Sequence, residues 1–321
     1  MNQNISHERN LFSNLPIGLI GTTLGMVILA NVYEVIGFKS IQFILMNIGA
    51  FILILGLLKL IAFPKKVWQE SKKPELYSTY IAFPMAIMTI GKFYLQYNLL
   101  VARILWYGGA ALDIFIVVTF LFMYVVKKPK LENISPSWFL LLVGSVVIPA
   151  SNFDAMTLPF CRIVWLCCLV AYIIILPLVA YRCLKLPLPE AIYPYLGITA
   201  APASLLIVGY LSVNAPNLQF LTCMLIIAII LTIFVYTKIY KVFILKFKPS
   251  FAGLTFPLAI SCLCEFKTSA YYDKLGFSQI SLILRSLGYL ELIITSIVIL
   301  AIFVMFFMHF LKLVSKKPNA Y

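Results

Sequence analysis

Long apolar stretches alternate with short polar breaks along the whole chain. About 20 apolar residues cross a bilayer as a helix, because lipid offers no hydrogen-bonding partner to a free backbone group. The pattern therefore predicts an all-α integral membrane protein, with one transmembrane domain over residues 1–321. Ten spans are predicted, at 13–34, 41–63, 76–97, 99–126, 137–157, 159–184, 191–213, 218–243, 251–269 and 281–313.

A proline recurs in every odd-numbered span, about one helical hairpin apart. Proline inside a helix removes a backbone donor and clashes with the preceding turn, so we expect these helices to be kinked. The even-numbered spans are more uniformly apolar, which is typical of helices that face lipid. The pattern predicts five helical hairpins, with the kinked helices innermost around a central pore. The prolines are Pro16, Pro84, Pro149, Pro202 and Pro257.

Two features leave the hairpin interpretation open to alternatives. The chain has 17 prolines, so some must fall in apolar spans by chance, and Pro177 interrupts an even-numbered span. Gly18 is expected to thin the pore wall as the prolines do. The pair Gly21 and Gly25, however, has the spacing of a helix-packing motif, and this second interpretation is equally compatible with the sequence.

Composition and charge support a membrane protein and indicate its orientation. The chain is 63% hydrophobic and 11% charged, with a mean hydropathy of +1.01 and a net charge of +14. Basic clusters follow the even-numbered spans, so the positive-inside rule predicts a plasma (inner) membrane protein with both termini cytoplasmic. This bias explains the charge without a nucleic-acid partner. The basic residues are Arg9, Lys65, Lys66, Lys72, Lys73, Lys127, Lys128, Lys130, Arg182, Lys185, Lys238, Lys241, Lys246, Lys248, Lys312, Lys316 and Lys317.

The predicted inner helices carry no acid or base in their middle thirds, where Ser, Thr, Gly, Pro and Phe prevail. Four basic residues near the outside, two of them in even-numbered spans, would raise the local anion concentration at a pore mouth. Each could instead extend its charge to the lipid headgroups. These four residues are Lys92, Arg103, Arg162 and Lys267.

Other chemistry is sparse. Asp113 and Glu291 lie in even-numbered spans, where each could relay protons, pair with a neighbouring base or cap a bent backbone. The only cysteine pair with a metal-ligand spacing is Cys262 and Cys264, with no histidine nearby in sequence, so packed thiols are favoured over a metal site. The sequence has no HExxH, GxSxG or phosphate-binding glycine loop. We therefore expect neither an enzyme nor a cofactor.

Four segments, "SNLPIGLIG", "TYIAFPMAIMTIG", "AAPASLLIVGYLSVN" and "GLTFPLAIS", resemble the inner helices of the tellurite-resistance/dicarboxylate transporter (TDT) family. That family includes the bacterial tellurite-resistance protein TehA and the plant guard-cell slow anion channels. The resemblance implies five hairpins around a pore, a homotrimer and an anion channel for small monovalent anions such as chloride or nitrate. It also implies a pore-gating phenylalanine, which Phe256 matches. Glu265 departs from the spacing expected of the plant members.

Three functions remain open at this point. The first is the anion channel, gated by Phe256. The second is a proton-coupled carrier of C4-dicarboxylates or other organic anions, or an efflux/resistance transporter. A carrier needs an ionisable group near its path, which Asp113, Glu291 or Lys92 would have to supply. The third is a membrane receptor or scaffold without flux.

Overall fold

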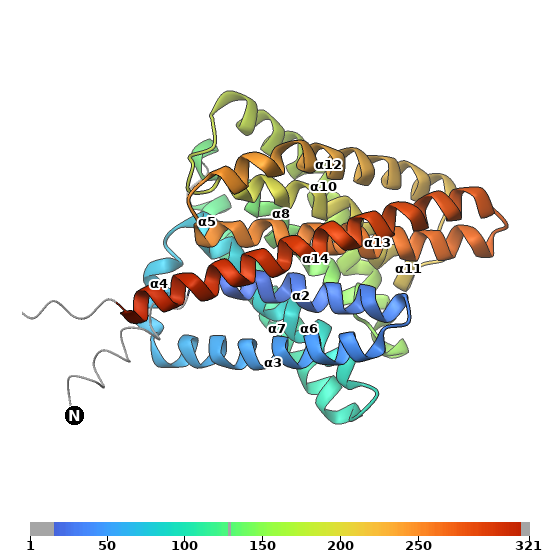
Figure 1. Cartoon of the computed structure of the whole chain (residues 1–321), viewed down its shortest axis with the longest axis horizontal. Coiled ribbons are helices and arrows are strands. Elements are labelled where there is room, and N and C mark those ends of the chain that lie inside the picture. The colour runs from blue at the N-terminus through green and yellow to red at the C-terminus, as the bar shows by residue number, and fades with distance from the viewer. Residues whose placement is uncertain (1–15, 128–129, 316–321) are drawn as a thin grey trace, which may run out of the picture.

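The computed structural model describes residues 16–127 and 130–315, and within these ranges every regular element is a helix (Figure 1). This confirms the predicted all-α class. In the described part of the chain, eight helical segments are long and apolar enough to cross a membrane. They are α2 (Gly18–Val35), α3 (Lys39–Ala62), α7 (Leu99–Phe120) with η2 (Leu121–Val126), η5 (Ala155–Thr157) with α10 (Leu158–Lys185), η6 (Tyr193–Ala200) with α11 (Ala201–Val213), α12 (Leu218–Ile244), η7 (Pro249–Leu254) with α13 (Thr255–Lys274), and α14 (Ser278–Ser315).

The third and fifth predicted spans differ from the prediction, because each is a series of short helices. The first series is α5 (Pro74–Tyr77), η1 (Ser78–Ile81) and α6 (Ala82–Tyr94). The second is α8 (Ser137–Leu142), η4 (Gly144–Val146) and α9 (Val147–Ala150). Such breaks are tolerated at membrane depth where protein, rather than lipid, surrounds the backbone. Most residues of η1, α6, α8, η4 and α9 are indeed buried.

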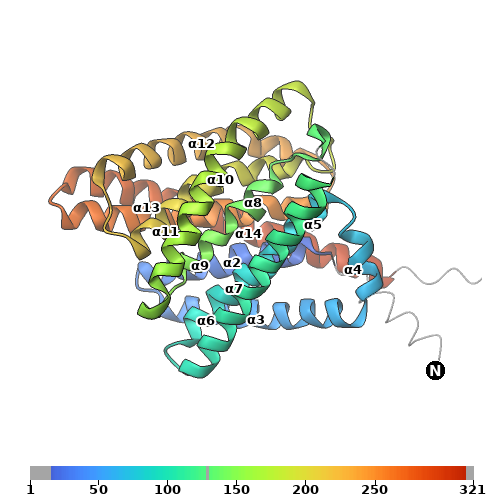
Figure 2. The same cartoon turned by 180° about the vertical axis from the view of Figure 1, so that it is seen from behind.

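Burial separates the long segments into two groups. In the most apolar window of each segment, 94% of Pro249–Lys274, 72% of Tyr193–Val213 and 67% of Gly18–Val35 is buried. The corresponding fraction for the other five is between 28% and 39%. The buried group includes α2, α11 and α13. Figures 1 and 2 show the more exposed helices α10, α12 and α14 outside α11 and α13. The buried and exposed segments therefore alternate along the chain.

The five prolines of the hairpin pattern lie at changes of helix type rather than in helix interiors, unlike Pro177, which lies inside α10. Pro84, Pro202 and Pro257 are within the first three residues of α6, α11 and α13, directly after the 3-10 segments η1, η6 and η7. Pro149 likewise follows η4 in α9, and Pro16 precedes α2. In a first turn, proline costs no intrahelical hydrogen bond. The regular α-helix is therefore interrupted by a 3-10 segment, which lies on the N-terminal side of each of the four later prolines.

Glycines of α2 allow close contact with η7 and the start of α13. A Cβ added at Gly18 would lie 2.2 Å from the carbonyl oxygen of Pro249, and one added at Gly25 would lie 2.6 Å from the Cβ of Thr255. The Thr255 hydroxyl donates a hydrogen bond to the carbonyl of Gly21 at 3.2 Å. Of the two interpretations of this glycine series, the contacts support helix packing.

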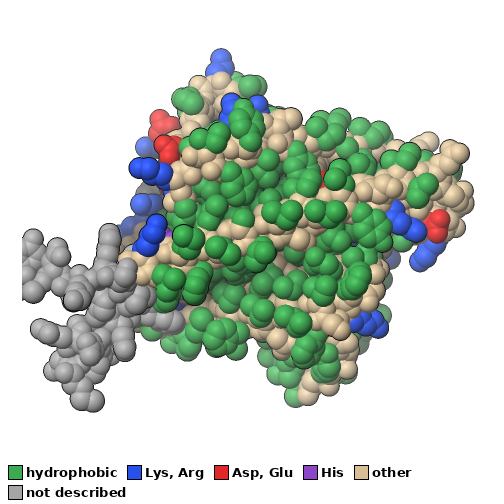
Figure 3. All heavy atoms as spheres, in the orientation of Figure 1, with side chains coloured by type: hydrophobic (Ala, Val, Ile, Leu, Met, Phe, Trp, Pro, Cys, Tyr) green, Lys and Arg blue, Asp and Glu red, His purple; other side chains and the backbone are tan. Residues whose placement is uncertain are grey.

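The beginning of α2 and the end of α14 lie at the same end of the molecule, near α4 (Pro64–Glu70) (Figure 1). Figure 3 shows a mostly hydrophobic face with charged side chains gathered towards its ends. Several helices able to span a membrane and this surface define a multi-pass membrane protein. Four basic residues of the orientation argument, Arg9, Lys128, Lys316 and Lys317, lie outside the described residues.

Candidate functional site

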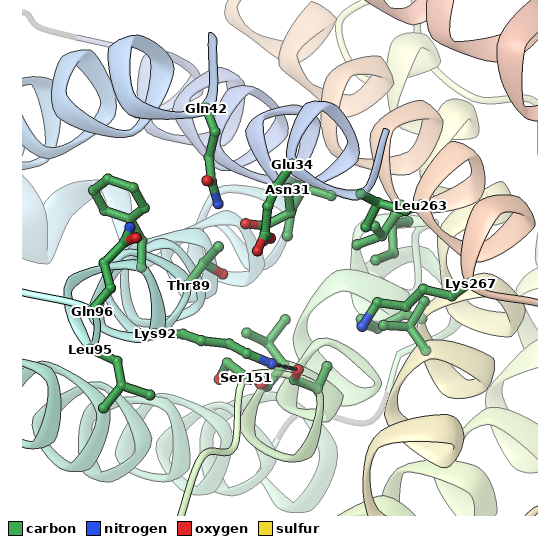
Figure 4. Close-up of a pocket in the computed structure, with 18 residues that line it drawn as sticks. Asn31, Glu34, Gln42, Thr89, Lys92, Leu95, Gln96, Ser151, Leu263 and Lys267 are labelled. Carbon is green, nitrogen blue, oxygen red and sulfur yellow. Dashed lines mark hydrogen bonds between the residues drawn. The ribbon is translucent and has the colours of Figure 1, made fainter. Parts of the chain in front are cut away.

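A cavity of about 310 Å³ lies among the C-terminal halves of the buried segments, and we call it the polar cavity (Figure 4). The three buried long segments and the two series of short helices, together called the five buried segments, all contribute to it. The contributing elements are α2, α6, the end of α8–α9, α11 and α13. Gln42 of α3 and two residues that follow α6 complete the lining. The lining residues are Ile28, Asn31, Glu34, Val35, Gln42, Thr89, Lys92, Phe93, Leu95, Gln96, Val147, Ala150, Ser151, Leu205, Val208, Ile260, Leu263 and Lys267.

Three charged side chains line the polar cavity. Lys92 reaches in from α6, Lys267 from α13 and Glu34 from α2 (Figure 4). The Nζ of Lys92 donates a hydrogen bond to the carbonyl oxygen of Ala150 at 3.1 Å. The two ammonium groups are close enough to repel each other, and Glu34 attracts both. Two positive charges against one negative charge make the polar cavity favourable to anions.

A second cavity, of about 20 Å³, lies among the N-terminal halves of the same segments, and we call it the apolar cavity. Thr79 of η1, Leu140 of α8 and Ile198 of η6 represent three of those segments in its wall. Among the described residues that line it, none is charged. The lining residues are Ile17, Gly18, Gly21, Leu24, Thr79, Leu140, Tyr195, Ile198, Pro249, Ala252, Gly253, Phe256 and Pro257.

The two cavities are separated by about one helical turn. Phe256 lines the apolar cavity and Ile260 lines the polar cavity, four residues further along α13. Leu24 and Ile28 have the same relation on α2. Four residues of α-helix span about 6 Å. Phe256, Leu24 and Ile260 are all buried, so large apolar side chains form the barrier between the cavities.

The structure brings together some of the residues singled out by sequence. Lys92 and Lys267 share the polar cavity, while Phe256, Pro257 and Gly18 line the apolar one. The remaining predicted residues, Pro16, Pro84, Pro149, Pro202, Arg103 and Arg162, are not among the residues that line either cavity.

The two arginines have other partners. Arg103 is half exposed, and its guanidinium lies 3.7 Å from a carboxylate oxygen of Asp154. The Nε of Arg162 donates a hydrogen bond to the carbonyl oxygen of Val213 at 2.8 Å. Both belong to outer helices, so their charges act from beside the polar cavity and not within it.

Sequence reasoning missed Glu34, Gln42 and Gln96 in the polar cavity. Glu34 closes the first predicted span, and a lone acid at the end of an apolar helix was the available signal. The expectation of no acid in the middle of an inner helix is also wrong for the ninth span. The helix α13 continues to Lys274, so the buried Glu265 lies near its middle.

Fold and site together define a multi-pass membrane protein whose buried segments enclose two cavities at successive levels. The model of the voltage-dependent anion channel family matches residues 14–310. The chain therefore belongs to this family, which is the one that its inner segments resemble. Members of the family are transporters or channels and not enzymes.

One relative among curated proteins adds to this. An uncharacterised transporter of the archaeon Methanocaldococcus jannaschii is 29% identical over 200 residues. The match covers 56% of this chain and 58% of that protein, so the chain spans little more than half of the relative's length. The similarity agrees with membrane transport as the class of function.

Proposed function

We propose that the protein is an anion channel that conducts small monovalent anions, such as chloride or nitrate, passively across the plasma membrane. One observation carries the proposal: the same five buried segments line both cavities, one above the other. A route along the axis of these segments passes from the polar cavity, over one helical turn, into the apolar cavity. The family to which the chain belongs makes anions the natural cargo.

The charge distribution supports anions over cations. Lys92 and Lys267 attract an anion into the polar cavity, and Glu34 moderates that attraction. Among its described lining residues, the apolar cavity has no charged side chain that would trap the ion. A conduction path needs binding that is favourable enough for entry and weak enough for release.

Phe256 is the proposed gate. Its side chain is buried, lines the apolar cavity and lies one turn before Ile260 at the floor of the polar cavity. A bulky apolar ring at this level closes a narrow path by filling it and by excluding water. Opening then requires the ring to leave the axis.

All five segments around the cavities belong to a single chain, so each subunit would contain a complete path. A homotrimer with one path per subunit and both termini in the cytoplasm completes the proposal. The trimer rests on the resemblance of the inner segments alone. Native mass spectrometry of the detergent-solubilised protein tests it, and a monomer or dimer would overturn it.

The polar cavity favours a second candidate, a proton-coupled carrier of C4-dicarboxylates or other organic anions, including an efflux or resistance transporter. Its volume of about 310 Å³ exceeds the need of a chloride ion. Two ammonium groups and the side-chain amides of Asn31, Gln42 and Gln96 could hold two carboxylates of one molecule.

Planar-bilayer recording of the purified protein, with liposome flux alongside, separates these functions. Conductive anion currents that need no proton gradient support the channel. Anion uptake that occurs only with a proton gradient supports the carrier. Absence of flux for every anion, inorganic or organic, would overturn both. The matched control is the double variant Lys92→Gln/Lys267→Gln, which should lower flux in either case.

A further inference from the structure

Two buried carboxyl groups lie on the far side of α13 from the polar cavity. Glu265 of α13 and Glu291 of α14 are 5% and 6% exposed. Leu263 and Lys267 line the polar cavity, and Glu265 is two residues from each. Two residues correspond to about 200° around an α-helix. Glu265 therefore points away from the cavity, towards α14, where it lies close enough to Glu291 for their charges to interact.

Hydroxyl groups surround the two carboxyls. Ser261 lies one turn before Glu265, and its hydroxyl is 2.9 Å from that of Thr232 on α12. Thr295 lies one turn after Glu291 and is fully buried. Within the described residues, Oε2 of Glu265, Oε2 of Glu291 and the hydroxyls of Thr295 and of Tyr236 on α12 make no hydrogen bond. Four buried polar atoms around the pair are thus left without a partner.

No cation faces this carboxyl pair in the part of the chain that the structure describes. Neither carboxyl takes part in the ion pairs of Lys59 with Glu70, Arg103 with Asp154, and Lys248 with Glu190. Lys267, the nearest base on α13, lines the polar cavity on the opposite side of the helix. The segments α11, η6 and η7, which also pack on α13, contain no charged residue.

The other titratable groups around the pair are neutral donors. Tyr236 of α12 and Cys262 and Cys264 of α13 lie within electrostatic range of both carboxyls. The thiol of Cys262 donates to the carbonyl oxygen of Gly288. From α2, the hydroxyl of Tyr33 lies 3.0 Å from that of Ser296 on α14. None of these groups supplies a positive charge.

Two like charges cannot both persist unpaired in a low-dielectric interior. A proton removes the conflict, because it neutralises one of the two carboxylates and gives that carboxyl an O–H group that can donate a hydrogen bond. We propose that Glu265 and Glu291 form a proton-binding site that retains at least one proton at neutral pH, and that release of this proton lowers anion flux.

The release step breaks one carboxyl O–H bond, leaves its electron pair on the carboxylate oxygen and transfers the proton to water. It places two negative charges between α13 and α14. The helix α13 carries Phe256, Ile260 and Lys267 on its other side. Repulsion at the α14 side presses α13 towards the path, and the added negative charge also opposes anions. The flux part rests on the proposed function; the proton-binding part does not.

Infrared pH-difference spectroscopy of the protein in liposomes tests proton binding without any flux. Raising the pH from neutral to alkaline should remove a protonated-carboxyl carbonyl band in the wild-type protein. The double variant Glu265→Gln/Glu291→Gln should lack this change, since amides do not titrate. The matched control Asp113→Asn removes another buried carboxyl and should retain it. A full band change in the double variant would overturn the site.

Single variants guard against a double variant that fails to fold. In Glu265→Gln or Glu291→Gln the remaining carboxyl loses its like-charged neighbour. Its band should therefore titrate at a lower pH than in the wild type. An unchanged midpoint in both single variants would show that neither carboxyl influences the protonation of the other.

Flux measurements over the same pH range test the second part. Wild-type anion flux should fall several-fold towards alkaline pH, and Asp113→Asn should behave alike. The double variant should be nearly independent of pH. A fall that survives in the double variant would overturn the control of flux. Wild-type protein without anion flux at any pH would instead contradict the channel, and the infrared band would still decide the proton site.

Discussion

The polar and apolar cavities share the same five segments, yet they differ in volume and chemistry. The polar cavity measures about 310 Å³ and contains three charged side chains. The apolar cavity measures about 20 Å³, and none of its described lining residues is charged. The difference indicates that attraction of an anion and resistance to its passage are assigned to separate levels. Charge then determines how often an anion occupies the polar cavity. The bulk of the apolar side chains determines the barrier to its passage into the apolar cavity.

Backbone contacts explain why the apolar cavity is narrow. Gly18, Gly21 and Gly25 let α2 approach η7 and the start of α13. Close approach of these two segments leaves little space on the axis between them. At the other end, the polar cavity is bordered by long side chains such as Lys92 and Lys267, which reach in from farther away.

The largest expected effect is all-or-none and concerns which cavity faces outward. Asn217 joins α11, which lines the polar cavity, to α12, and Asn133 precedes α8, whose Leu140 lines the apolar cavity. With cytoplasmic termini, an impermeant thiol reagent should label Asn217→Cys in intact cells but not Asn133→Cys. Permeabilised cells and the unsubstituted protein are the controls. The reverse pattern would turn the apolar cavity to the outside.

The second largest effect is expected when the side chain of Phe256, in the barrier between the cavities, is truncated. Phe256→Ala should raise anion conductance at least tenfold, because a barrier lowered by about 1.4 kcal/mol suffices for that factor. Single-channel recording measures it, with thermal stability determined in parallel. Loss of about 3–5 kcal/mol of stability, as for a packing residue, together with unchanged conductance would rule out the gate.

Phe251 offers a matched control for that experiment. It is as buried as Phe256 but packs against Phe243 and Phe247, away from both cavity linings. Phe251→Ala should therefore lower the thermal stability without raising conductance.

A smaller effect is expected from the charges of the polar cavity. Lys92→Gln/Lys267→Gln should lower anion conductance by up to about tenfold at low salt, because focused charge raises local ion concentration. Glu34→Gln should raise conductance. Both effects should shrink at high salt through screening. Arg103→Gln is the control, and an equal loss there would mean that general surface charge, and not the cavity, is responsible.

The smallest effect concerns selectivity among anions. Passage over the apolar barrier requires partial loss of hydration water, so permeability should follow the ease of dehydration, with iodide and nitrate ahead of chloride. Reversal potentials measure the order. Preference for chloride would instead place selectivity at Lys92 and Lys267, where a small ion gains most from direct charge contact.

The helical class and most helix positions could be predicted from hydrophobicity, because lipid forces long apolar segments to be helical. The prolines were visible too, but their local effect depends on where each helix begins. A shift of helix start turns an expected interior proline into a first-turn residue, as for Pro257 in α13. The same kind of shift, at the C-terminal end of α13, moved Glu265 from the last third of a helix to its middle.

The candidate site was predictable only in part, because convergence of distant residues is a tertiary property. Lys92 and Arg103 lie on either side of one short connection between helices. Nothing in their spacing reveals that Lys92 enters a cavity and that Arg103 pairs with Asp154. Gln42 belongs to an outer helix, which an alternation of inner and outer segments assigns to lipid. Its position at the polar cavity follows from how α3 packs on α2.

The length of α14 has a consequence for the membrane border. Its 38 residues correspond to about 57 Å of helix, whereas the hydrocarbon layer is about 30 Å thick. Tilting of the usual extent shortens the vertical reach only modestly. One or both ends of α14 must therefore extend beyond the hydrocarbon, into the layer of lipid headgroups or the water beyond it.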